Sequence, residues 1–151
     1  MAIEIVRGCI FEGFERGDIN YLVHQVNCIG AFGGLAGEVG RRYPAVYDDY
    51  MYRIRSQTNL LGQYQHVRLE PDKYIINIFG QQDIGTNKRQ TNYGALPEAL
   101  VKFRDDRLYR VGHNIGFPYK FASNLAGADW TIVLEMIEFI FRDHNVKIYQ
   151  L

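Results

Sequence analysis

The sequence predicts an α/β domain in which helices cover both faces of a sheet. Short β-branched and aromatic runs alternate with segments of helical periodicity along the 151 residues. No repeat, low-complexity tract or Pro/Ser-rich linker interrupts this alternation, so residues 1–151 are expected to form one domain. Two predicted connections from a strand to a helix contain glycines. Ligands bind at such connections in α/β sheets.

Six segments have the composition of strands. Residues 21–26 are mainly β-branched and aromatic and run into Asn27-Cys28-Ile29-Gly30, which predicts a strand that passes into a loop. Glu70-Pro71-Asp72 predicts a turn between two later strands. In chain order, the predicted strands are residues 3–6, 21–26, 64–69, 74–79, 111–117 and 146–149.

Four segments are predicted to be helical. Residues 35–43 and 45–55 form one helical region interrupted at Pro44, because a proline disfavours helix in the residue before it. Residues 97–107 begin with a proline, which the first turn of a helix tolerates. Residues 130–142 give the clearest signal, since apolar side chains recur along one stripe. The stripe consists of Trp130, Val133, Leu134, Ile137 and Phe141, widened by Met136 and Ile140.

The composition excludes several classes of protein. Lys and Arg total 17, as do Asp and Glu, whereas binding nucleic acid through its phosphates needs a basic excess. The hydrophobic content of 47% is too high for a disordered chain, and no apolar run reaches the ~20 residues of a membrane span. Two cysteines give no disulfide framework, and the first residues do not resemble a secretory signal. We therefore expect a cytoplasmic protein with no membrane partner and no preference for nucleic acid.

The first glycine-rich loop, residues 27–36, is the strongest local signal. It leaves a predicted strand and enters a predicted helix, so its backbone N–H groups could approach an anion at the helix N-terminus. A tight strand-to-helix turn would need the same glycines. The spacing matches neither a Walker loop nor G-x-G-x-x-G, which argues against a simple kinase, GTPase or dehydrogenase.

A second glycine-containing loop, residues 122–130, makes the same kind of connection. Two such loops at one edge of a sheet could hold the two ends of a diphosphate. Between them, residues 80–92 carry two glutamines with Lys88 and Arg89 and could cover a ligand, although a solvated connection needs no function.

Six features follow one another over nearly the whole chain. They are Val-His-Gln-Val-Asn-Cys at residues 23–28, the first glycine-rich loop, Arg42-Tyr43-Pro44, Thr91-Asn92-Tyr93, Leu125-Ala126-Gly127-Ala128-Asp129-Trp130 and Val146-Lys147-Ile148-Tyr149. Together they resemble the macro domain family, most closely the branch of ADP-ribose 1''-phosphate phosphatases and terminal ADP-ribose–protein glycohydrolases. Similar stand-alone domains occur in bacteria and their phages. The resemblance implies a three-layer α/β/α sandwich around a mixed sheet, with ADP-ribose or a derivative at the strand ends and no cofactor.

The resemblance also implies roles for individual residues. Asn27 is similar to the asparagine that contacts the distal ribose. His24 and Asp129 are the expected catalytic residues, because they match a histidine proposed as catalytic and an aspartate common in the phosphatase branch. The implied ligand-binding positions are Cys9, Ile10, Asn27, Gly30, Ala31, Phe32, Gly33, Gly34, Leu35, Ser123, Asn124, Leu125, Ala126 and Gly127.

The sequence departs from the family pattern at two places. Cys9 stands where many macro domains have a polar residue that hydrogen-bonds the adenine amino group, and a thiol is a weak donor and acceptor. The second loop reads Ala122-Ser123-Asn124-Leu125 where the family usually has Gly-Cys-Gly-Leu, so two Cβ atoms are added near the phosphates. No lysine matches the nucleophile of the glycohydrolase branch.

Each chemical candidate also has a structural interpretation. His24 could be a hydrogen-bonded core imidazole or a general acid–base, and Asp129 could cap a helix or activate water. Both cysteines are expected to be small buried hydrophobes, and the other three histidines lack metal-ligand spacing, so no metal is predicted. Three functions stay open: a hydrolase that removes phosphate from ADP-ribose 1''-phosphate, an ADP-ribose reader or protein de-ADP-ribosylase, and an interaction scaffold that has lost its ligand.

Overall fold

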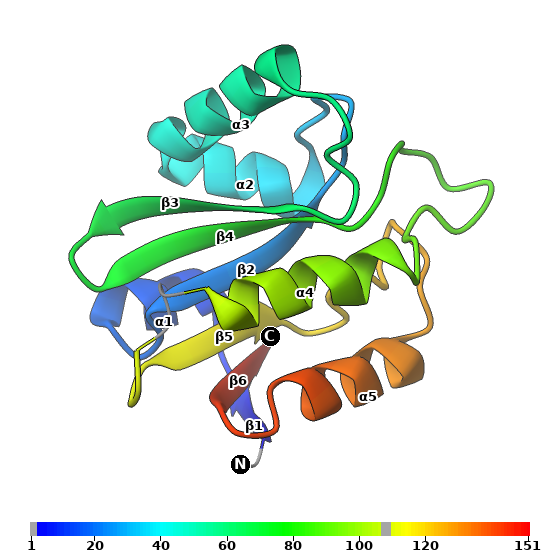
Figure 1. Ribbon diagram of the computed structural model, residues 1–151. Coiled ribbons are helices and arrows are strands. Elements are labelled where there is room, and N and C mark those ends of the chain that lie inside the picture. The colour runs from blue at the N-terminus through cyan, green and yellow to red at the C-terminus, as the bar shows by residue number, and fades with distance from the viewer. Residues whose placement is uncertain (1–2, 107–109) are drawn as a thin grey trace.

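Residues 3–106 and 110–151, which the structure describes, form three layers: a six-stranded sheet between three helices on one face and two on the other. Figure 1 shows this arrangement in the computed structural model. The elements in chain order are β1 (Ile3–Arg7), α1 (Ile10–Arg16), β2 (Tyr21–Val26), α2 (Gly34–Arg42), α3 (Pro44–Ser56), β3 (Tyr64–Glu70), β4 (Lys73–Phe79), α4 (Ala95–Asp105), β5 (Asn114–Pro118), α5 (Trp130–Ile140) and β6 (Asn145–Gln150).

The sheet is mixed, with strand order β1-β6-β5-β2-β4-β3. Only β3 runs antiparallel to its neighbour, and the other pairs within the described chain are parallel. The carboxyl ends of β2 and β5, two neighbouring strands, therefore lie at the same edge, and the loops that leave them meet there. The predicted α/β class, with its three layers and mixed sheet, is confirmed.

Alternate side chains of β2 enter two separate cores. Tyr21 and Val23 pack among residues of α4 and α5, whereas Leu22 packs on the opposite face among residues of α1, α2 and α3. Because β2 is buried on both faces, its apolar residues run continuously instead of alternating with polar ones. His24, two residues after Leu22, lies on the side of α1 to α3 and is buried.

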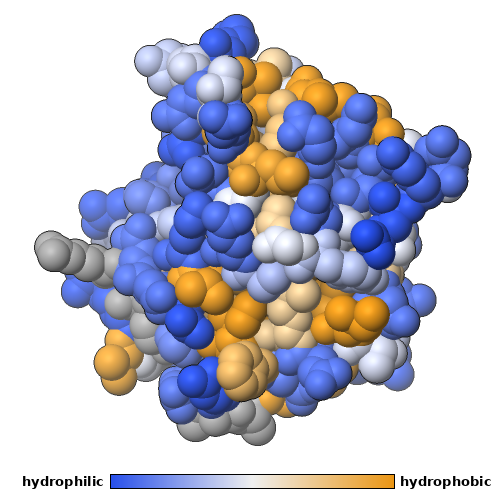
Figure 2. Space-filling model, turned by 45° about the vertical axis from the view of Figure 1, so that its right-hand side comes forward, coloured by the Kyte–Doolittle hydropathy of each residue, from blue (hydrophilic) through white to orange (hydrophobic). Residues whose placement is uncertain are grey.

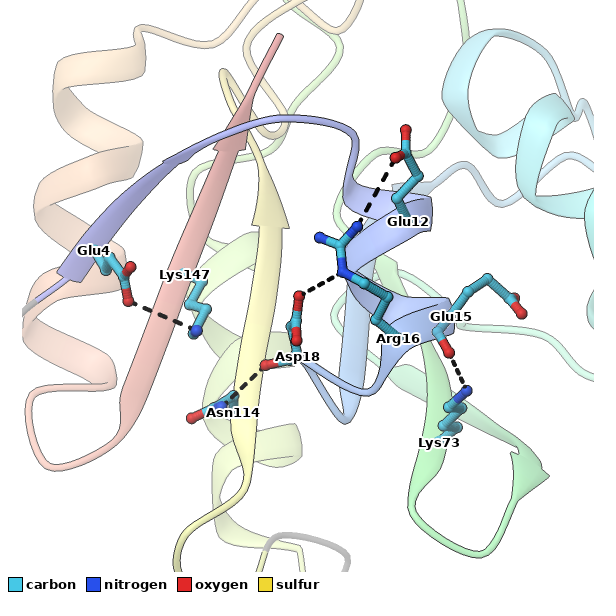
Figure 3. A network of polar contacts seen from close by, with 8 residues as sticks. All are labelled: Glu4, Glu12, Glu15, Arg16, Asp18, Lys73, Asn114 and Lys147. Carbon is cyan, nitrogen blue, oxygen red and sulfur yellow. Dashed lines mark hydrogen bonds and ion pairs between the residues drawn. The ribbon is translucent and has the colours of Figure 1, made fainter.

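Helix α1 was not predicted from the sequence. It has seven residues and contains Gly13, which weakens a helix, but a Cβ at Gly13 would lie 2.3 Å from the Tyr149 hydroxyl oxygen. Contacts with distant strands hold this helix and the chain after it. The Lys73 ammonium donates to the Glu15 carbonyl oxygen, and the Asn114 amide donates to the Asp18 carbonyl oxygen (Figure 3). These partners are far away in the sequence.

Among the predicted boundaries that fall on described residues, three differ from the structure by two or more residues and several others by one residue. Strand β5 begins at Asn114 and not at residue 111, because Val111 is 98% exposed in a turn. Helix α4 begins two residues before Pro97, and the Asn92 side chain accepts hydrogen bonds from the first N–H groups. Its predicted end at Arg107 lies outside the described residues. Helix α5 ends at Ile140, two residues before the predicted end.

Candidate functional site

A cavity of about 770 Å³ opens at the carboxyl ends of β2 and β5. Its wall combines the end of β2, the first turn of α2, part of the loop after β4 and the segment after β5. Figure 2 shows this side of the molecule, where apolar surface gathers in the middle between polar side chains. The cavity thus lies where the two predicted ligand loops meet.

Ten of the sixteen predicted site residues line this cavity. They are His24, Asn27, Ala31, Phe32, Gly33, Gly34, Leu35, Asn124, Leu125 and Ala126. The remaining six lie outside the cavity wall: Cys9, Ile10, Gly30, Ser123, Gly127 and Asp129. Cys9 and Ile10 follow β1, which is three strands away from β2 in the sheet. A Cβ at Gly30 would face Met51 and Ile54 of α3.

Further lining residues were not singled out as ligand-binding. Those from β2 and α2 are Gln25, Val26 and Ala36, and those from the loop after β4 are Gln81, Ile84, Gly85 and Thr86. The segment after β5 adds Pro118, Tyr119, Lys120, Phe121 and Ala122. The loop after β4 belongs to residues 80–92, for which the sequence offers two interpretations, a cover for a ligand and a solvated connection. The sequence signal for the segment after β5 is its place directly after a predicted strand, since ligands bind at the carboxyl ends of strands in α/β sheets.

Asn27 organises the first loop from within. Its Oδ1 atom accepts hydrogen bonds from the backbone N–H groups of Ile29 and Ala31, both at 3.1 Å, and from the Tyr50 hydroxyl at 2.8 Å. Its amide group donates to the Ala31 carbonyl oxygen at 2.6 Å. Asn27 is therefore engaged in hydrogen bonds that fix the loop, while it also lines the cavity.

The N-terminus of α2 lines the cavity and has N–H groups without intrahelical partners. Gly33 precedes the helix in an extended conformation, and no side chain caps residues 34–36. The N–H groups of Gly34, Leu35 and Ala36 have no partner within the helix, because the first intrahelical partners lie one turn later. The first turn of α2, within the described chain, also carries no carboxylate. These donors and the helix dipole favour an anion at this wall.

The loop after β4 is bonded to both ligand loops. Gln90 and Thr91 donate backbone hydrogen bonds to the Ala126 carbonyl oxygen, at 2.8 and 3.1 Å. The Thr91 hydroxyl donates to the Ala122 carbonyl oxygen at 2.7 Å. On the other side, the Cys28 N–H donates to the Gln82 carbonyl oxygen at 3.0 Å. The three segments therefore form one connected wall.

Lys120 is the single Lys or Arg among the described residues that line the cavity. It is exposed and has φ +60°, and Ala122, two residues later, has φ +61°. Both lie in the left-handed region, which costs roughly 1–2 kcal/mol for a residue with a Cβ atom. Arg89, by contrast, stacks its guanidinium 4.1 Å from the centre of the Tyr93 ring and donates to the Thr91 carbonyl oxygen.

His24 is a buried, neutral imidazole in the cavity wall. It is 1% exposed, and its Nε2 atom lies 2.5 Å from Oδ1 of Asn77. Burial lowers the pKa of His24 to about 4, although the hydrogen bond with Asn77 acts in the opposite direction. The Nδ1 atom has no hydrogen-bond partner among the described residues. The ring therefore offers one unsatisfied acceptor at neutral pH.

Asp129 is the N-cap of α5. Its Oδ1 atom accepts from the Thr131 backbone N–H at 2.9 Å, and its own N–H donates to the Tyr93 hydroxyl oxygen at 2.8 Å. The side chain is exposed outside the cavity. The structure therefore shows the capping interpretation of this residue, and a catalytic role stays a prediction.

No cluster of three or more His, Cys, Asp or Glu side chains in the described part of the chain is placed to hold a metal ion. Within residues 3–106 and 110–151, no helix combines the length and apolar character needed to cross a membrane.

No protein-family model and no curated protein matches the sequence. Solved structures do match. A protein of unknown function from Bacteroides thetaiotaomicron has a TM-score of 0.85 at 23% identity, covering 100% of this chain and 99% of that one. A macrodomain protein from Streptomyces coelicolor has a TM-score of 0.78 at 26% identity, with 99% of both chains covered. The structure of Thermosipho africanus DarTG in complex with ADP-ribose has a TM-score of 0.73 at 16% identity, covering 97% of this chain and 41% of that chain. The chain therefore has the macro domain fold.

Proposed function

We propose that this protein binds ADP-ribose or an ADP-ribose derivative in the cavity. The observation that carries the proposal is the N-terminus of α2, which lines the cavity and has three N–H groups without intrahelical partners. A diphosphate placed there would be stabilised by these donors and by the helix dipole. The ammonium of Lys120 on the same wall adds a full positive charge.

The remaining wall is suited to the sugar and base portions of such a ligand. Phe32, Ile84, Tyr119 and Leu125 contribute apolar and aromatic surface, and the last three are substantially exposed. A volume of about 770 Å³ lies within the range of small-molecule sites. The structural similarity to DarTG, which was determined in complex with ADP-ribose, supports the same ligand class.

Removal of phosphate from ADP-ribose 1''-phosphate is a second proposed function. It is favoured by the unpartnered Nδ1 atom of His24, a residue that lines the cavity, since this atom could take part in proton transfer. Asp129 lies outside the cavity wall and caps α5, so His24 is the better placed of the two predicted groups. With a pKa of about 4, His24 would act at neutral pH as an acceptor.

Calorimetric titration with ADP-ribose at neutral pH tests the binding proposal. We expect saturable binding, weaker binding of AMP, and an affinity about 10-fold lower in Lys120→Gln, since the contact of an exposed charge lies near the lower end of the range for charge-assisted hydrogen bonds, about 1.5 kcal/mol. Lys102→Gln is the matched control, because Lys102 lies on α4 and pairs with Glu98. The absence of a measurable heat of binding at millimolar ADP-ribose would refute the binding proposal and favour an interaction scaffold that has lost its ligand.

A phosphate-release assay with ADP-ribose 1''-phosphate then distinguishes the hydrolase from the other ligand-dependent functions. Release that depends on His24 would support the phosphatase. Binding without release would leave the reader, or a de-ADP-ribosylase that acts on ADP-ribosylated protein. The latter is measured with an ADP-ribosylated protein as the substrate.

A further inference from the structure

A row of three polar side chains crosses the sheet directly behind the cavity. His24 on β2 is paired in register with Asn77 on β4, which is paired with Gln65 on β3. They are 1%, 0% and 5% exposed. Burying polar groups is costly unless they are hydrogen-bonded, and apolar residues at these positions would avoid the cost. The row therefore needs a reason beyond packing.

The hydrogen bonds of this row have a fixed direction. At its end, the backbone carbonyl oxygen of Asp49 on α3 can only accept, so the Gln65 amide must direct its NH₂ group there, at 3.1 Å. The Oε1 atom of Gln65 then accepts from the NH₂ group of Asn77 at 2.9 Å.

The direction of these hydrogen bonds also determines which nitrogen of the His24 imidazole carries the proton. Since the NH₂ group of Asn77 faces Gln65, its Oδ1 atom faces His24 and requires a donor there. The proton of neutral His24 is therefore on Nε2, and Nδ1 carries the lone pair. Nδ1 is buried and lacks a hydrogen-bond partner among the described residues, and His24 lines the cavity.

We propose that Asn77 and Gln65 are positioning residues that fix the tautomer of His24, so that Nδ1 accepts a hydrogen bond from a hydroxyl of the bound ligand. A fully ionised phosphate oxygen would set lone pair against lone pair, so this position favours a hydroxyl donor over an ionised phosphate oxygen. The ligand half of the inference rests on the proposed function. The tautomer half concerns the free protein alone.

Nitrogen NMR of the histidine rings tests the tautomer without any ligand. We expect the Nε2–H form of His24 in the parent protein and a mixture of tautomers in Gln65→Leu, where the Asn77 amide is free to turn over. Gln65 does not touch His24, so this change would show action through Asn77. An Nδ1–H form in the parent would overturn the inference.

Ligand titrations of Asn77→Leu test the second half. Pyrophosphate is the probe for the anion site, because it carries no hydroxyl. We expect ADP-ribose affinity to fall at least 5-fold and pyrophosphate affinity to stay within 2-fold. Ile75→Val, on the same strand and face, is the control for a disturbed core and should change neither affinity.

The two possible failures are distinguishable. Equal losses for ADP-ribose and pyrophosphate in Asn77→Leu would show a merely structural role and overturn the inference. Absence of ADP-ribose binding to the parent would overturn the proposed function together with the ligand half, while the NMR result would still decide the tautomer.

Discussion

Gly33→Val separates ligand binding from folding at the start of α2. Gly33 has φ −126° and ψ 179°, an extended conformation that a β-branched residue adopts readily. A Cβ built there meets no heavy atom within 4 Å beyond its chain neighbours. Gly34, the next residue, has φ +56° and would be strained by the same change. The valine side chain therefore enters open space beside the unpaired N–H groups.

The valine is expected to change the free energy of unfolding much less than the affinity for ADP-ribose. Replacing glycine restricts the unfolded chain and stabilises by about 0.4–1 kcal/mol, whereas valine is a poorer N-cap residue than glycine. The free energy of unfolding should thus change by less than about 1 kcal/mol, or roughly 2–4 °C in Tm. A diphosphate displaced from these donors would lose charge-assisted hydrogen bonds worth about 1.5–3 kcal/mol, which corresponds to an affinity loss of roughly 10- to 100-fold.

Calorimetry with ADP-ribose and a thermal melt, performed on the same samples, measure both quantities. Ala45→Val is the matched control, since Ala45 is exposed in the first turn of the neighbouring helix α3 and lies outside the cavity wall. Parental affinity in Gly33→Val would show that the N-terminus of α2 is not the anion site. A fall in Tm above 10 °C would contradict the argument from the backbone conformation.

Three further predictions concern single residues. Asp129→Asn should keep the N-cap of α5 and any phosphate release that the parent shows. Asp129→Ala should lower the free energy of unfolding by about 0.5–2 kcal/mol, as measured by a thermal melt. Loss of phosphate release in Asp129→Asn without loss of stability would instead establish a catalytic carboxylate. Ala122→Gly should stabilise by about 1 kcal/mol, since it relieves a positive φ, and Ala45→Gly in α3 should destabilise. The contribution of His24 to stability should fall by about 2 kcal/mol from pH 7 to pH 5, because unfolded His24 gains a proton below its ordinary pKa of 6.5 while the folded group, with a pKa of about 4, does not. Urea unfolding of the parent and of His24→Gln measures this, and an equal pH dependence in both would exclude His24 as the cause.

Elements whose burial follows a local periodicity could be predicted from the sequence. The stripe of α5 is one example, with Val133 and Ile137 fully buried as their spacing indicates. Helix α1 could not be predicted, because it is short, contains Gly13, and depends on contacts with strands that are distant in the sequence. Propensity is a weak guide wherever tertiary contacts decide.

The same distinction applies to the site. The first loop could be predicted because glycines at a strand-to-helix connection are a local signal. Cys9 and Ile10 were expected nearby, but β6 and β5 separate β1 from β2, which at ~4.8 Å per strand puts the end of β1 about 14 Å along the edge. The partners of His24 were missed because the register that places Asn77 and Gln65 beside it is a property of the folded sheet.

The zero net charge of the chain is compatible with the proposed anion site because that site consists mainly of backbone dipoles. Backbone N–H groups at the start of α2 create a positive potential without any ionised side chain, and Lys120 is the one full positive charge added by the described residues of the wall. His24, which also lines the cavity, is neutral, and its buried Nδ1 atom holds a lone pair without a hydrogen-bond partner among the described residues. Under the proposed function, donors for a diphosphate and an acceptor for a hydroxyl are supplied by one site, and a ligand that satisfies both carries anionic oxygens together with a hydroxyl group, as ADP-ribose does. Inorganic phosphate or pyrophosphate alone would leave this acceptor unsatisfied, so we expect both to bind more weakly than ADP-ribose if the proposed function is correct.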